Sequence, residues 1–261
     1  MGSCNSGGKG SSISIMGSST PLPPQTDSNT QIDVDDTQVA TAFSANYDAF
    51  MAMSDDDKAD FISANIKQGV PAHLAQNDFQ RFVYNSGLND KPNVVSDATL
   101  DTMTGTEIFR TVNNVYDSKN DISYTADQIA KQVTAGRMTR VSDNGGSVYG
   151  RGIYFADGYS SSTSYGYSSG NVKKTAVMRG KLNSNAKVVN YYTASQGVSK
   201  EISSGSKLGN VLRKADSDSR VSIYAMAKGY NVISSGHGYL NVLNRNAITM
   251  SSDIKPKGSS W

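Results

Sequence analysis

The segment from Tyr149 to Gly166, YGRGIYFADGYSSSTSYG, combines residue types that could hold a flat, polar aromatic ligand. Glycines flank Arg151, an apolar run containing Tyr154 follows, and a serine cluster containing Ser162 leads to Tyr165. Two phenol rings can stack on the two faces of a ligand ring, and a serine hydroxyl between them can read an amide on that ring. The residue types therefore predict a slot in which Tyr154 and Tyr165 face one another with a serine hydroxyl between them.

A strand and a helix must position these residues. The apolar run Ile153–Ala156 predicts a strand, and the serine-rich residues after Tyr159 predict a helix. Gly150 and Gly152 before the strand allow a close backbone approach or an unusual turn. The pattern is not a dinucleotide-binding fingerprint, because the third glycine is absent and a strand follows instead of a helix.

The ungapped run GRGIYFADGYSSSTSYG resembles the second motif of the ADP-ribosyltransferase superfamily. It is similar to the poly(ADP-ribose) polymerase signature of glycine, basic residue, glycine, Ile-Tyr-Phe-Ala-Asp and Ser-x-Ser-x-x-Tyr. The resemblance implies that NAD is the substrate and that Tyr154, Ser162 and Tyr165 enclose and hydrogen-bond its nicotinamide. Ser162-Thr163-Ser164 also fits the Ser-Thr-Ser of the toxin-like, arginine-specific branch, and we favour the register that uses Ser162.

The earlier strand EIFRTVN stands where the family has its first motif. Polymerase-like members have histidine in this motif, whereas Arg110 fits the toxin-like branch. A guanidinium suits the diphosphate or the ribose edge of NAD. The resemblance therefore implies that Arg110, Thr111 and Gly152 also contact NAD.

The third family motif is a glutamate at the start of a late strand, and this chain departs from it. The family's glutamate bonds the nicotinamide ribose and stabilises the positive charge that develops as the glycosidic bond breaks. In the strand GYLNVLNR, Tyr239 and Asn241 take its place in two alternative alignments, and neither supplies a full negative charge near neutral pH. Three interpretations stay open: a slow transferase that uses Asn241 or Tyr239, an enzyme that recruits Glu201, and a fold that has lost catalysis.

The resemblance covers about residues 96–255 and implies an α+β fold with a split β-sheet core. The implied function is mono-ADP-ribosylation, in which the bond to nicotinamide breaks and ADP-ribose passes to a protein side chain. The alternative is a weak or inactive structural protein of the same fold. The chain also resembles ADP-ribosyltransferase-like proteins of tailed bacteriophages, which implies a bacterial cytoplasm or a virion assembly as its location and partner.

Three segments follow from the composition and periodicity. Residues 1–36 are rich in Ser, Gly and Pro and predict a disordered arm. Residues 37–95 predict a helical segment in which Ser54 caps one helix and Pro71 opens another. Residues 96–261 alternate short strands and helices, and because strands outnumber helices, the α+β class is favoured.

Composition argues against several other functions. The net charge is +2, so no strong field directs the chain to nucleic acid or to a membrane surface. One cysteine, Cys4, and two histidines, His73 and His237, make a disulfide framework or a metal site unexpected. No apolar run reaches the roughly 20 residues of a transmembrane helix, and the first residues lack the apolar region of a secretory signal. The partner that the resemblance implies is a protein acceptor of ADP-ribose.

Overall fold

The computed structural model describes residues 46–70, 77–88, 91–117, 122–134, 148–165 and 175–259. The chain divides into two units, Met1–Val34 and Asp35–Trp261, and every described residue belongs to the second. The predicted arm and the predicted helix start at Pro71 lie outside the described residues. Within the described part, no helix has the length and apolar character needed to cross a membrane.

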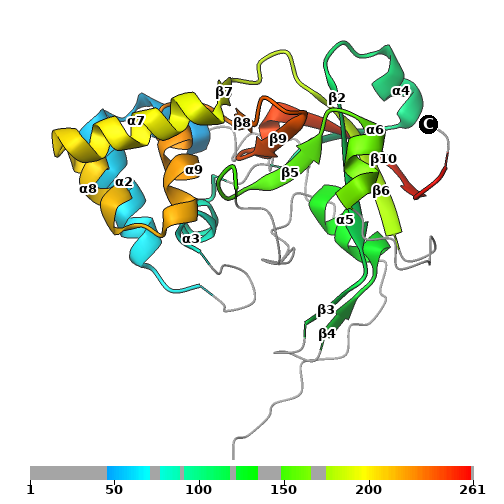
Figure 1. Ribbon diagram of the computed structural model, residues 1–261, viewed down its shortest axis with the longest axis horizontal. Coiled ribbons are helices and arrows are strands. Elements are labelled where there is room, and N and C mark those ends of the chain that lie inside the picture. The colour runs from blue at the N-terminus through cyan, green and yellow to red at the C-terminus, as the bar shows by residue number, and fades with distance from the viewer. Residues whose placement is uncertain are drawn as a thin grey trace, which may run out of the picture. The chain divides into compact units, whose positions relative to one another are not determined.

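A mixed eight-stranded sheet has the order β1-β10-β6-β2-β5-β9-β8-β7 (Figure 1). A two-stranded antiparallel sheet of β3 and β4 accompanies it. The strands are β1 (Asn93–Val95), β2 (Glu107–Asn113), β3 (Val115–Asp117), β4 (Ile122–Tyr124), β5 (Ile153–Ala156), β6 (Thr175–Leu182), β7 (Val188–Asn190), β8 (Val232–Ser234), β9 (Tyr239–Val242) and β10 (Ile248–Pro256).

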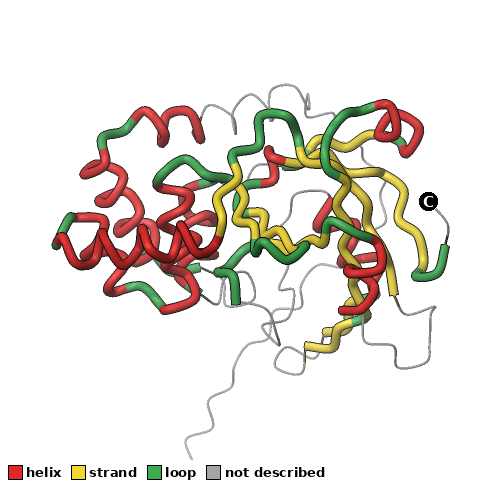
Figure 2. The backbone as a smooth tube through the Cα atoms, turned by 45° about the horizontal axis from the view of Figure 1, so that its top comes forward, coloured by secondary structure: helices red, strands yellow, loops and turns green. Residues whose placement is uncertain are grey.

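Helices and strands mix along the chain, which confirms the α+β class (Figure 2). Residues 46–52 are helical. The further helices are α2 (Asp55–Lys67), α3 (Asp78–Ser86), α4 (Asp97–Thr102), α5 (Ala126–Thr134), α6 (Tyr159–Tyr165), α7 (Tyr191–Ser204), α8 (Lys207–Lys214), α9 (Ser217–Ala227) and the 3-10 helix η2 (Arg245–Ala247).

Helices from both ends of the described chain share one apolar core. Phe50, Ile62 and Phe82 from the N-terminal helices pack with Leu212 and Met226 from the C-terminal ones. We call α2, α3, α7, α8 and α9 the helical group. The sequence predicted an N-terminal helical layer, and the structure adds that this layer is completed by helices more than a hundred residues away.

The sheet and α5 build a second core. Ile129 and Val133 of α5 pack with Ile108 of β2, Phe155 of β5 and Leu240 of β9.

Local capping signals place several helix starts as predicted. The side chain of Ser54 accepts a hydrogen bond from the Asp57 amide at the start of α2. Thr125 and Gln128 exchange side-chain to backbone bonds before α5 and so form a capping box. The short strand β7 ends at Asn190, because the Asn190 side chain caps α7 and the chain turns helical at Tyr191.

Candidate functional site

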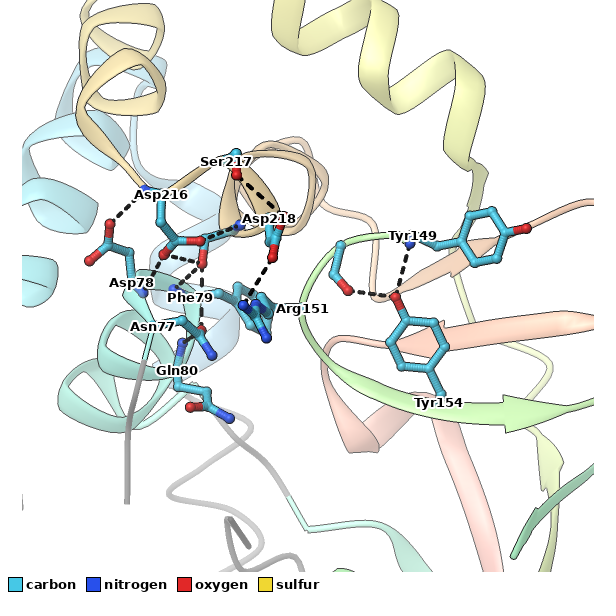
Figure 3. Close-up of polar contacts among 12 residues, drawn as sticks. Asn77, Asp78, Phe79, Gln80, Tyr149, Arg151, Tyr154, Asp216, Ser217 and Asp218 are labelled. Atoms are coloured by element: carbon cyan, nitrogen blue, oxygen red, sulfur yellow. Dashed lines mark hydrogen bonds and ion pairs between the residues drawn. The ribbon is translucent and has the colours of Figure 1, made fainter. Parts of the chain in front are cut away.

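A short turn before β5 is held by side chains from three directions. We call residues 149–152 the 149–152 turn. The hydroxyl of Tyr154 donates to the Gly150 carbonyl at 2.6 Å and accepts from the Tyr149 amide at 3.0 Å (Figure 3). Burial raises the pKa of Tyr154 well above its ordinary value, although the bond from Tyr149 opposes this rise. Both hydrogen bonds of the Tyr154 hydroxyl thus go to the turn, so Tyr154 could contact a ligand through its ring.

Asn241 supports the same turn from the neighbouring strand. Its Nδ2 atom donates to the Tyr149 carbonyl at 3.0 Å and to the Arg151 carbonyl at 3.3 Å. Its side chain is 1% exposed, and its Oδ1 atom lies against the space that a Cβ atom on Gly152 would take. A side chain buried in this way is not presented to a ribose hydroxyl, so the expected ligand contact of Asn241 is not supported. Glycine fits at position 152 because a Cβ atom there would overlap the Asn241 side chain.

The third support comes from α9. Ser222 donates to the Arg151 carbonyl at 2.6 Å, and Arg151 forms an ion pair with Asp218 at 2.9 Å. A Cβ atom on Gly150 would lie only 2.5 Å from the Ser222 hydroxyl. Sequence reasoning missed Asp218 and Ser222, although their spacing of four puts them on one side of a helix.

Strand register places the candidate residues on the faces of the sheet. Tyr154 pairs with Asn241, and Ala156 pairs with both Tyr239 and Phe109. Because directly paired residues point to the same side of a sheet, these side chains share one face. We call it the α6 face, since Tyr159 of α6 packs edge-on against the Phe109 ring.

Residues of the first and second predicted motifs meet on the α6 face. The Thr111 and Ser162 hydroxyl oxygens lie 3.0 Å apart, and Ser162 is 4% exposed. Tyr165 ends α6, but its side chain lies outside the described part, so its stacking role stays a prediction. The structure therefore brings Thr111 and Ser162 together, and the stacking partner expected opposite Tyr154 is not identified.

Arg110 lies on the opposite face from Thr111, because side chains alternate along a strand. Its Nη1 atom donates to the Tyr154 carbonyl at 2.7 Å. Burial lowers the pKa of Arg110 to about 10. Burial also lowers the pKa of Arg245 to about 9, and the charge of Arg110 adds to this shift.

The bond from Arg110 spans the weakest pairing of β2. Strands β2 and β5 share the single register pair Phe109–Ala156, whereas β2 and β6 share the seven pairs from Glu107–Lys181 to Asn113–Thr175. Arg110 thus links two strands that diverge on either side of one contact.

Glu201 belongs to the helical group. It pairs with Lys228 at 3.0 Å and accepts from the Ser206 hydroxyl at 2.5 Å, and Lys228 also pairs with Asp55. The bond from Ser206 and the neighbouring Lys228 hold the pKa of Glu201 below its ordinary value despite partial burial. The structure gives Glu201 a role in joining helices and does not place it with the other candidate residues.

Comparison of the chain with protein-family models, with curated proteins and with solved structures gives no match. The described residues contain no group of three or more His, Cys, Asp or Glu side chains arranged to hold a metal ion.

Proposed function

We propose that the protein binds NAD on the α6 face and transfers ADP-ribose from it to a protein side chain with low turnover. The observation that carries the proposal is the pairing of Thr111 with Ser162, which joins two motifs that lie 51 residues apart in sequence. A buried hydroxyl of this kind can exchange its partner for the carboxamide of nicotinamide. The ring of Tyr154, on the same face of the sheet, would stack on the ligand.

The proposed reaction breaks the bond between nicotinamide and ribose and passes the ribose to an acceptor nucleophile. Positive charge develops on the ribose in the transition state, and a carboxylate would stabilise it. The residue at the start of β9 is Tyr239, half-buried on the α6 face. A phenol can accept a ribose hydrogen bond but carries no charge near neutral pH. Removing one such stabilising group typically costs about 10²–10³ in rate, so we expect slow transfer.

Asn241 favours a second candidate function. Both of its amide contacts go to the 149–152 turn, so β9 offers no amide to the reacting ribose from that position. A protein built in this way could keep the fold and the NAD site as a structural module, for example in a virion, without transfer.

One experiment separates the two functions. The full chain is incubated with labelled NAD and bacterial lysate, and labelled protein and released nicotinamide are both measured. Transfer predicts both signals, with a loss of at least about tenfold in Ser162→Ala. The matched control Ser160→Ala changes an exposed serine of the same helix and should leave the rate unchanged. NAD binding without either signal would replace the transferase by the structural module.

A further inference from the structure

We propose that Asp218 and Ser222 of α9 are positioning residues for NAD: they hold the 149–152 turn, and through it the ring of Tyr154, in the ligand-binding orientation. The proposal rests on the function proposed above. The two residues lie in α9, outside the second motif, so the motif alone does not indicate their role.

Side chains form most of the hydrogen bonds that hold the 149–152 turn. Three successive carbonyls of the turn accept hydrogen bonds from side chains. Asn241 donates to the Tyr149 carbonyl and Tyr154 donates to the Gly150 carbonyl. The Arg151 carbonyl accepts from both Asn241 and Ser222. Backbone groups of a turn near the surface can usually bond to water instead. Bonding all three carbonyls to side chains fixes the turn in one conformation.

Helices outside the sheet also contact the turn: Ser222 and Asp218 of α9 reach Arg151, and Tyr191 of α7 packs edge-on against the Tyr149 ring. Asp218 and Ser222 are four residues apart in α9 and reach the side chain and the carbonyl of the same residue, Arg151. The backbone of Gly150 approaches Ser222 so closely that no larger residue fits there. The helix and the turn therefore move as one piece.

Reciprocal caps fix where α9 begins. The Asp78 amide donates to the Asp216 carboxylate at 2.8 Å, and the Asp216 amide donates to the Asp78 carboxylate at 2.8 Å (Figure 3). The hydroxyl of Ser219 also accepts from the Phe79 amide at 2.9 Å. Because α3 packs in the core of the helical group, the first turn of α9 has a rigid base from which Asp218 holds Arg151.

The expected effect is on binding more than on folding. Tyr154 receives its ring orientation from the Tyr149 amide and the Gly150 carbonyl, so a loosened turn loosens the ring. NAD would then have to order the turn as it binds, which lowers affinity by the entropy of that ordering. Two separate apolar cores hold the fold when one turn loosens.

The test is calorimetric titration of the full chain with NAD, below the measured unfolding temperature of every variant. Asp218→Asn and Ser222→Ala should each weaken binding about threefold, and the double variant about tenfold, since the ion pair is partly exposed and the serine contributes one hydrogen bond to the turn. Asp218→Glu keeps the charge and should restore binding to within about twofold. Asp127→Asn, which breaks the exposed pair with Lys131, is the matched control and should bind normally.

Folded single variants that bind NAD as tightly as the unaltered chain would overturn this inference and leave the proposed function standing. Equal weakening in Asp218→Glu and Asp218→Asn would also overturn it, because the carboxylate would then not be what holds Arg151. An unaltered chain that neither binds nor consumes NAD would overturn the inference together with the proposed function.

Discussion

The side-chain amide of Asn241 occupies the space in which residue 152 would carry a Cβ atom, so glycine is the residue that fits above it. The same amide donates to two carbonyls of the 149–152 turn. Asn241, for which the family resemblance implies a catalytic position, is thus a structural support of the 149–152 turn. This relationship sets where a carboxylate could be introduced and where it could not.

Gly152→Ala should destabilise the fold by about 2 kcal/mol, because the added methyl group overlaps the Asn241 amide and the site is already packed. Urea unfolding of the full chain measures this change. Gly69→Ala is the control, since no atom lies near a Cβ atom at that position. Equal stability of Gly152→Ala and the unaltered chain would contradict the close approach.

A carboxylate at position 239 should raise turnover, whereas one at position 241 should not. Asn241→Glu loses two donated hydrogen bonds and buries a charge, so it should lose about 3 kcal/mol of stability. Position 241 is one of the two places that the resemblance implies for the motif glutamate, but the burial of Asn241 argues against a gain of activity there. Tyr239→Glu places the charge at the start of β9 on the α6 face and should gain about tenfold or more.

Rates of nicotinamide release in Tyr239→Glu and Tyr239→Gln provide the check. The neutral glutamine has the same shape and should gain nothing. A matching gain in both variants would show that removing the phenol matters and that the charge does not.

Tyr154→Phe should lower stability at neutral pH by about 1–2 kcal/mol, because two hydrogen bonds of the turn lose their partner. It should also change the alkaline response. The folded-state pKa of Tyr154 lies above the value of about 10 in the unfolded chain, so this group's stabilisation is complete below pH 10 and is lost above it.

The check is the free energy of unfolding between pH 8 and 11, with Tyr192→Phe as control because Tyr192 is 69% exposed. The unaltered chain should lose up to about 1.4 kcal/mol per pH unit more than Tyr154→Phe above pH 10. Parallel curves would mean that the phenol is not buried as described.

Glu201→Gln should weaken the helical group and leave NAD affinity unchanged. Its folded-state pKa lies below the unfolded value of about 4.3, so its stabilisation is present above that pH and is lost as the pH falls. The variant should therefore lose about 1 kcal/mol at pH 7 and show a shallower acid dependence. A loss of NAD turnover at unchanged stability would instead return Glu201 to the catalytic role that the sequence left open.

Much of the fold could be predicted from local signals. The alternation of side chains along a strand is enough to put Tyr239 and Asn241 on one face, with Leu240 and Val242 toward a core, and the register with β5 and the second core agree with it. The cap at Ser54 is a local hydrogen-bonding pattern and was predicted for the same reason.

The supports of the turn could not be predicted from the sequence. The contacts of Asn241 and Ser222 with the turn join residues 71 to 92 positions apart, and no local pattern encodes them. The same holds for Asp78 and Asp216, whose reciprocal caps depend on two helices meeting end to end. Residue types indicated polar chemistry near Tyr154, but the packing of the turn decides that the Asn241 amide is buried against it.

Calorimetric titration of the full chain with NAD, with Ser162→Ala alongside, tests the central claim most directly. The account predicts saturable binding by millimolar NAD in the unaltered chain and binding at least about fivefold weaker in Ser162→Ala, since that variant loses the hydroxyl that Thr111 positions. No binding by the unaltered chain at millimolar NAD, or equal affinity in Ser162→Ala, would contradict an NAD site built on Thr111 and Ser162.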